Sequence, residues 1–289
     1  MQAPGTMDPI AFFYRIPGRS GAHRPGAHQA STNGAGHAFH SHARLFDLPD
    51  PRRLDVRASL RAGRGEWLVR TYRQRAAITL RLLVDISASM QVGAPLRKLD
   101  IAAQIAESAG HSAFAVGDAV GLLAFDAAHR EDLYFPVVHS RGAGMQMRLA
   151  IAACTPGRTA GCGLVETARQ LAGRRELVLL VSDFHWPLAV MAEAMDMLSH
   201  AWLVPLVVWD RTELAPPPVD GFVTLRDAET GAATPVWVNA RLRQRWAAQL
   251  ENRRRALDAL FGSRGLQPLY LDGGFDAAAL SRYFVEQTP

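Results

Sequence analysis

The chain has 289 residues, 48% of them hydrophobic and 20% charged, so it can bury the core of one sizeable α/β domain, alone or with an appendage. The formal net charge of +5 is interleaved with acidic residues and accompanied by no nucleic-acid-binding motif, which predicts a mildly basic surface and no nucleic-acid partner. Two cysteines are too few for a disulfide framework, and no apolar stretch reaches the ~20 residues that cross a bilayer, so we expect a cytoplasmic protein without a transmembrane segment.

Residues 1–45 are rich in Gly, Ala, Ser, Pro and His and show no apolar period. Such a segment cannot bury enough apolar surface to offset the entropy lost on ordering. We therefore expect a flexible N-terminal segment. Its histidines are irregularly spaced and lack neighbouring cysteines or acids, so they do not indicate a metal site.

Buried strands alternate with amphipathic helices from residue 76 onward. Continuously apolar runs such as Leu177–Val181 are typical of strands covered on both faces, and the apolar spacing within Lys98–Ala115 is typical of an amphipathic helix. This alternation predicts an α/β fold with a doubly wound, mostly parallel sheet. The expected strands are Ala76–Asp85, Val120–Phe125, Tyr134–Val138 (at an edge, because of Pro136), Leu177–Val181, Leu203–Trp209 and Leu269–Leu271, and the expected helices are Lys98–Ala115, Leu164–Leu171, Leu188–Leu198, Arg241–Phe261 and Ala277–Phe284.

Residues 216–239 interrupt this alternation. The strand-like segments Phe222–Leu225 and Pro235–Val238 flank the turn-like sequence AETGA, which predicts a small inserted β-hairpin. The helix Arg241–Phe261 that follows is rich in arginine. We expect these arginines to face solvent, although they could also meet an acidic partner.

The sequence Asp85-Ile86-Ser87-Ala88-Ser89 stands between a predicted buried strand and a predicted helix. In a tight turn, its alternate side chains can point into one cavity and offer one carboxylate and two hydroxyl oxygens. Doubly wound sheets bind ligands at the carboxyl ends of their strands. Such hard oxygen ligands suit Mg²⁺, at about 2.0–2.1 Å. We therefore predict that Asp85, Ser87 and Ser89 bind Mg²⁺, with Mn²⁺ or Ca²⁺ as alternatives.

Asp183 follows the predicted strand Leu177–Val181 and should lie at the same edge of the sheet. Together with Asp85 it would roughly neutralise a divalent cation, while the serine hydroxyls add no charge. The cation could then accept a further carboxylate from a partner, which favours binding over a reaction. The alternative that Ser87 and Ser89 only cap the following helix stays open at this point.

The ordered set of motifs resembles a known family. The sequence LLVDISASM at Leu82–Met90, followed by KLDIAAQIAESAGHSAFAVGDAVGLLAF from Lys98, is similar to the metal-binding strand, first helix and second strand of von Willebrand factor A domains. Over about residues 10–285 the chain resembles the bacterial family known as domain of unknown function fifty-eight. The other motifs that carry this resemblance are Pro51–Ser59, Leu68–Tyr72 and Val181–Phe184.

This resemblance implies a von Willebrand factor A-like domain at residues 76–289, preceded by an N-terminal extension at 46–75. It also implies a metal-ion-dependent adhesion site and no catalytic activity. Similar proteins are encoded beside MoxR-type AAA+ ATPases and are thought to act with them as chaperone or assembly factors. The expected partners are thus a MoxR-type ATPase and its client, and methanol dehydrogenase maturation is one setting that the resemblance offers.

One loop departs from the family pattern. The family's site takes a threonine from a loop resembling G-G-T-D-L, but the aligned residues Ala160–Leu164 place Cys162 at that position. A thiol is a poor ligand for Mg²⁺. Thr159, three residues earlier, can supply the ligand if the loop is shifted. Otherwise the departure weakens the site or leaves it partly degenerate.

Two other functions stay open. A Mg²⁺-dependent phosphotransferase or hydrolase of the haloacid dehalogenase type also has an aspartate after its first strand. It needs a second acid two residues later as general acid/base, where this chain has Ser87. The second alternative is a scaffold whose metal site has decayed, as the Cys162 departure would allow. Neither a P-loop nor a G-x-S-x-G nucleophile motif is present. The sequence therefore favours a non-enzymatic, metal-dependent adaptor.

Overall fold

In the computed structural model, the chain divides into two compact units, one of residues Ile16–Ile78 and the other of residues Met1–Arg15 and Thr79–Pro289. None of the helices in the described part of the chain combines the length and the apolar character that crossing a membrane requires. The structure describes residues 11–16, 25–34, 38–63, 65–155, 157, 163–215 and 220–287.

The larger unit contains one six-stranded sheet, with strands β4 (Thr79–Asp85), β5 (Ala119–Phe125), β6 (Phe135–Val138), β7 (Leu177–Ser182), β8 (Trp202–Trp209) and β11 (Leu269–Asp272). Their order is β11-β8-β7-β4-β5-β6, and all neighbours are parallel except β5 and β6. Strand β7 is buried along its whole length, as expected of a strand covered on both faces. The predicted α/β class, the mostly parallel sheet and the edge position of the proline-containing strand are therefore confirmed.

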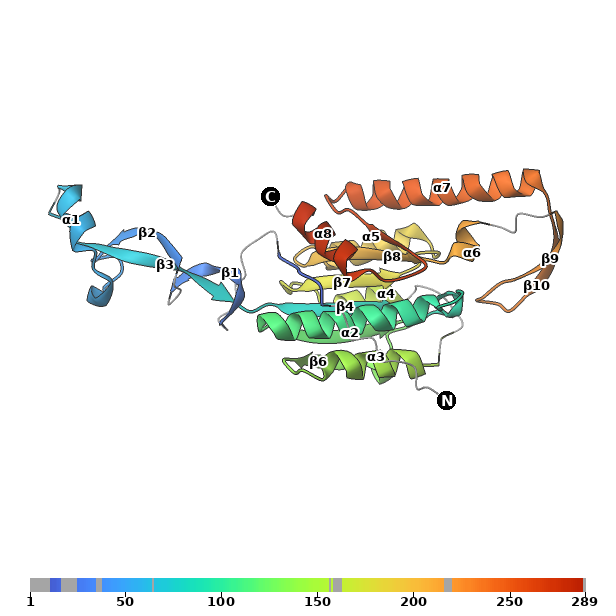
Figure 1. Cartoon of the computed structure of the whole chain (residues 1–289), viewed down its shortest axis with the longest axis horizontal. Helices are drawn as coiled ribbons and strands as arrows, with labels where there is room; N and C mark the ends of the chain where they lie inside the picture. Colours follow the sequence, from blue (N-terminus) through green and yellow to red (C-terminus); the bar gives the residue numbers. More distant parts are fainter. Residues whose placement is uncertain are drawn as a thin grey trace. The chain divides into compact units, whose positions relative to one another are not determined.

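Helices cover both faces of this sheet. In Figure 1, α2, α3 and α8 lie in front of the sheet and α4 and α5 lie behind it. This arrangement follows from the apolar stripes predicted from the sequence. The described helices of the larger unit, with their short 3-10 turns, are η2 (Ala88–Gln91), α2 (Lys98–Val116), η3 (Glu131–Leu133), α3 (Ala143–Ala153), α4 (Gly163–Arg169), α5 (Leu188–Met197), α6 (Arg211–Leu214), α7 (Ala240–Gly262) and α8 (Ala277–Gln287).

One hydrophobic core joins the sheet to α4, α5 and α7. The helices contribute residues such as Leu164, Met191 and Phe261, which cluster with Leu180 and Val207 of the sheet. All five are fully buried. Complete burial of each such side chain contributes about 1.5–3 kcal/mol, so this core fixes the strand ends relative to the helices behind them.

The predicted insertion is a two-stranded antiparallel hairpin. It consists of β9 (Gly221–Arg226) and β10 (Ala233–Val238), which pair from Arg226 with Ala233 to Gly221 with Val238. The side chains of β9 alternate between half-buried and exposed, as expected of a strand with one solvated face.

The smaller unit is a three-stranded antiparallel sheet with the order β1-β3-β2. Its Asp55 side chain accepts a hydrogen bond from the Ala58 N–H (3.0 Å), which caps a short helix, and accepts another from Arg70 (2.7 Å). The described elements of this unit are β1 (Pro25–Gly34), β2 (Ala38–Arg44), η1 (Pro51–Arg53), α1 (Val56–Ala62) and β3 (Leu68–Ala76).

These strands differ from the expectation of a flexible segment over residues 1–45. Both β1 and β2 lie within that range and pair with β3. The two strands are ordered by backbone hydrogen bonds to a neighbouring strand. Such bonds do not depend on apolar side chains, which are few in this segment. The boundary also differs, because the smaller unit extends from Ile16 to Ile78, where the sequence suggested an extension at 46–75.

The strand order places the predicted site at the topological switch point of the sheet, where successive strands are added on opposite sides of β4. From β4 the chain builds β5 and then β6 on one side, and it returns to β7 on the other side of β4. Ligand crevices in doubly wound sheets form at such a switch point, beyond the carboxyl ends of the two strands. The loops after β4 and β7 therefore frame the candidate site.

Candidate functional site

Asp85 is the last residue of β4 and is fully buried. Its Oδ1 accepts a hydrogen bond from the Ser87 N–H (2.9 Å), and its Oδ2 accepts from Ser182 Oγ (2.7 Å) and Trp186 Nε1 (3.0 Å). Burial and the nearby charge of Asp183 raise the pKa of Asp85 to about 6. Oδ2 thus uses both of its lone pairs on these donors, while Oδ1 keeps one for another ligand.

The two serines of the motif turn toward each other. Ser87 Oγ and Ser89 Oγ lie 3.2 Å apart, and the nearby Ser89 side chain helps to lower the pKa of Asp183. Helix α2 begins only at Lys98, nine residues after Ser89, and is capped through Arg97 and Asp100. The Ser87 side chain makes no capping hydrogen bond to η2. Capping of the following helix therefore does not account for the interactions of the Ser87 and Ser89 hydroxyl groups.

Lys98 places a cation beside the second aspartate. Its side chain is fully buried, and its Nζ donates to Asp183 Oδ2 (2.6 Å) and to Glu213 Oε1 (2.6 Å). Burial alone would favour the neutral form of Asp183, but the Lys98 ammonium holds the pKa of Asp183 below its usual value. The site therefore has a charged carboxylate at the end of β7 and an internal countercharge.

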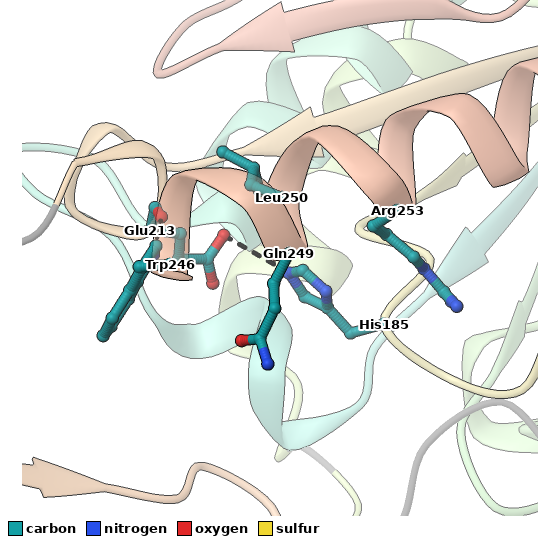
Figure 2. A pocket seen from close by; sticks show the side chains of 6 residues that line it. All are labelled: His185, Glu213, Trp246, Gln249, Leu250 and Arg253. Atoms are coloured by element: carbon teal, nitrogen blue, oxygen red, sulfur yellow. Dashed lines mark hydrogen bonds and ion pairs between the residues drawn. The ribbon is translucent and has the colours of Figure 1, made fainter. Parts of the chain in front are cut away.

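A second group of possible metal ligands shares Asp183. Ligand atoms of Asp183, His185 and Glu213 all lie within 4.8 Å of one another, so these residues could hold a metal ion. Figure 2 shows Glu213 directed at the His185 ring, with 3.6 Å between Glu213 Oε2 and His185 Nε2. Lys98 already occupies one oxygen of both acids, and a cation among these three residues would have to compete with its ammonium.

His185 and Glu213 border an open cavity beside α7. The cavity has a volume of about 420 Å³. Figure 2 shows Arg253 reaching over the loop after β7, where its guanidinium donates to the backbone carbonyls of Phe184 and Trp186. The residues that line the cavity are His185, Glu213, Trp246, Gln249, Leu250 and Arg253.

The donor set of the motif fits a hard divalent cation. Asp85, Ser87, Ser89 and Asp183 offer oxygen atoms only, as Mg²⁺, Mn²⁺ and Ca²⁺ prefer. The carboxylates of Asp85 and Asp183 supply the negative charge, and Lys98 offsets only part of it. The structure thus brings four of the five predicted ligands together, while the fifth, Thr159, and its competitor Cys162 lie outside the described residues.

Sequence reasoning missed several residues of this site. Lys98 carried an available signal, because it is the one lysine in a chain with 31 arginines. A compact ammonium fits between two carboxylates in a closed space where a planar guanidinium would not. His185 could also have been noticed, since it follows Asp183 by two residues in the same loop. Glu213 lies in a segment without a recognised motif. Glu229, which accepts a hydrogen bond from the Ser89 N–H, lies in the turn-like sequence AETGA, which indicates a hairpin but no metal ligand.

Comparisons with known proteins identify relatives of this chain. The model of the family described as "Protein of unknown function DUF58" matches residues 49–256. The chain is similar in structure to the conserved hypothetical protein BatB from Bacteroides thetaiotaomicron, with 17% sequence identity, coverage of 73% of this chain and 98% of that chain, and a TM-score of 0.44. It is also similar to an aerotolerance-related membrane protein from Bacteroides fragilis (15% identity, 73% and 98% coverage, TM-score 0.42). No curated protein matches the chain in sequence.

Proposed function

We propose that this chain, which belongs to the DUF58 family of proteins of unknown function, is a non-enzymatic adaptor that binds a partner protein through a divalent cation. Its domain would be von Willebrand factor A-like, with a metal-ion-dependent adhesion site. The observation that carries this proposal is the convergence of Asp85, Ser87, Ser89 and Asp183 at the switch point of the sheet.

These residues would hold Mg²⁺, or Mn²⁺ or Ca²⁺ in its place. The bound cation would supply positive charge at the surface end of the sheet. The aspartates would anchor it and the two hydroxyl groups would add ligands without adding charge. A cation held in this way keeps affinity for one more oxygen ligand, such as a glutamate or aspartate side chain of a partner.

The environment of Asp85 supports binding over phosphoryl transfer. A nucleophilic carboxylate has to present a free oxygen to its substrate. Asp85 is fully buried, and both of its oxygens already accept hydrogen bonds, Oδ2 from Ser182 and Trp186 and Oδ1 from the Ser87 N–H, which leaves a single lone pair on Oδ1 for a cation. Ser87 also stands where the haloacid dehalogenase type needs its second acid. These contacts suit a residue that anchors a cation.

The proposed partner is a MoxR-type AAA+ ATPase together with its client protein, in the cytoplasm. This part of the proposal comes from the resemblance of the motifs Leu82–Met90 and Val181–Phe184 to the family whose members are encoded beside such ATPases. An assembly or maturation step, for example that of methanol dehydrogenase, is the corresponding setting.

Metal titration tests the site directly. Mn²⁺ binding is measured by calorimetry on the chelator-treated full chain, as wild type and as the variants Asp85→Asn, Ser89→Ala and Glu193→Gln. We expect Asp85→Asn and Ser89→Ala to weaken Mn²⁺ binding about tenfold or more. Glu193 is exposed on α5, so Glu193→Gln is the matched control for loss of one negative charge and should bind as wild type does.

The partner is tested by capture of a purified MoxR-type AAA+ ATPase. We expect capture by the wild type and by Glu193→Gln in Mg²⁺, and loss of capture in EDTA or with Ser89→Ala. Because Ser89→Ala removes only a half-buried hydroxyl group, it keeps the test informative if Asp85→Asn fails to fold. Wild-type Mn²⁺ affinity in both site variants would refute the metal site. Metal-dependent phosphatase turnover that Asp85→Asn abolishes would favour the enzyme instead.

A further inference from the structure

The turn of the β9–β10 hairpin is held in one conformation by its own hydrogen bonds. Asp227 Oδ1 accepts from the backbone N–H groups of Glu229 (2.8 Å) and Thr230 (3.0 Å), and the Asp227 N–H donates to the Ala232 carbonyl (2.9 Å). Gly231 adopts a left-handed conformation with φ of 73°, which glycine tolerates without a steric penalty. The turn therefore presents the Glu229 side chain in a defined direction.

That direction is toward the loop after β4. Glu229 Oε1 accepts a hydrogen bond from the Ser89 N–H (3.1 Å), across 140 positions of sequence. Its other oxygen, Oε2, is shielded from solvent and has no hydrogen-bond partner among the described residues. Figure 1 shows the hairpin at the end of the sheet where β4 ends.

A shielded carboxylate oxygen without a donor is costly, because it has lost its water and gained no partner. The cost rises here because the like charge of Asp183 acts on Glu229. Lys98 cannot relieve it, since its ammonium is engaged by Asp183 and Glu213. A divalent cation held by the motif residues would give this oxygen the positive partner that it lacks.

We propose that Glu229 is a further ligand of the divalent cation, supplied to the site by the hairpin. This inference rests on the metal site of the proposed function, and it adds a third carboxylate to those of Asp85 and Asp183. The cation would then connect the loops after β4 and β7 with the inserted hairpin. Binding of the cation should accordingly hold the hairpin in place.

Two substitutions separate direct ligation from a general effect of charge. Glu229→Gln removes the charge, whereas Glu229→Asp keeps the charge and shortens the side chain by one methylene group. Mn²⁺ affinity is measured by calorimetry for the full chain, both variants, Asp85→Asn and the exposed control Glu193→Gln. Hydrogen exchange of the peptides covering residues 221–238 is measured with and without Mn²⁺.

If Glu229 is a ligand, both Glu229 variants lose about tenfold or more in Mn²⁺ affinity, and Glu193→Gln loses none. Mn²⁺ also slows exchange of the wild-type hairpin and has no such effect in Glu229→Gln. Wild-type affinity in Glu229→Asp, or hairpin exchange that ignores Mn²⁺ in the wild type, overturns the inference. If Asp85→Asn loses Mn²⁺ binding in either case, the metal site itself still stands. Wild-type affinity in both Asp85→Asn and Ser89→Ala would refute that site.

Discussion

Lys98 carries the ammonium that lies between Asp183 and Glu213, and its removal changes the charge of a closed cluster. Without this ammonium, Asp183 is a buried carboxylate that has lost its ion-pair partner. Breaking a buried ion pair in this way costs about 3–5 kcal/mol. We therefore expect Lys98→Met to lower the free energy of unfolding by about that amount in EDTA, as measured by urea denaturation.

Lys98→Met should also increase the stability that the protein gains when it binds a divalent cation. Loss of the Lys98 charge makes the cluster more negative and so more attractive to a divalent cation. Saturating Mg²⁺ should therefore restore more stability to Lys98→Met than it adds to the wild type. Lys98→Arg keeps the charge but has to fit a larger planar group into a closed space, and we expect it to be destabilised as well. Equal stability of Lys98→Met and the wild type in EDTA would contradict this view of the ammonium.

The site residues that lie at the ends of buried strands could be predicted from the sequence. The site residues that tertiary contacts bring to the site could not. Asp85 and Asp183 each follow a continuously apolar run, which is typical of a buried parallel strand. These runs alone indicate that both aspartates lie at the same edge of the sheet. Glu213 and Glu229 reach the site from a short helix and a hairpin turn. Their placement depends on how β8 and the hairpin are arranged in space, which no local pattern records.

At the scale of elements, α2 and α3 pack closely through two glycines. A Cβ atom on Gly110 would overlap the backbone of Gly144 on the facing helix. The helix backbones can approach in this way only because neither residue has a side chain. We expect Gly110→Ala to lower the free energy of unfolding by about 1–3 kcal/mol despite the better helix propensity of alanine, as measured by urea denaturation.

Gly262 provides the matched control at the end of α7. It is exposed, and an added Cβ would meet no atom within 4 Å. Gly262→Ala should therefore leave the stability unchanged or raise it by up to about 1 kcal/mol through helix propensity. A Gly110→Ala variant that gains stability as Gly262→Ala does would show that α2 and α3 are not in close contact.

The elements of the larger unit were predictable for a physical reason. Buried parallel strands need apolar side chains on both faces, so β4, β5, β7 and β8 appear as apolar runs in the sequence. The strands β1 and β2 have few apolar residues, and their order comes from backbone pairing with β3. Pairing between backbones leaves little trace in side-chain composition, which explains why this part of the fold was missed.

For the whole molecule, a cation that binds only the folded site must stabilise the unit that contains the site. Every proposed ligand lies in the larger unit, and the smaller unit, Ile16–Ile78, contributes none. At a metal concentration 100 times Kd, the stabilisation is about 2.7 kcal/mol. For a unit of this size that corresponds to a rise in Tm of about 5–10 °C.

We therefore expect Mg²⁺ to raise the Tm of the larger unit in scanning calorimetry and to slow hydrogen exchange in the peptides after β4 and β7. Exchange in β1, β2 and β3 should not change, because the cation has no ligand there. Ser89→Ala should respond only at higher Mg²⁺ concentrations, since stabilisation depends on concentration relative to Kd. A uniform change of exchange in both units, with the same Mg²⁺ dependence in Ser89→Ala, would indicate a general salt effect and would remove the support for a specific site.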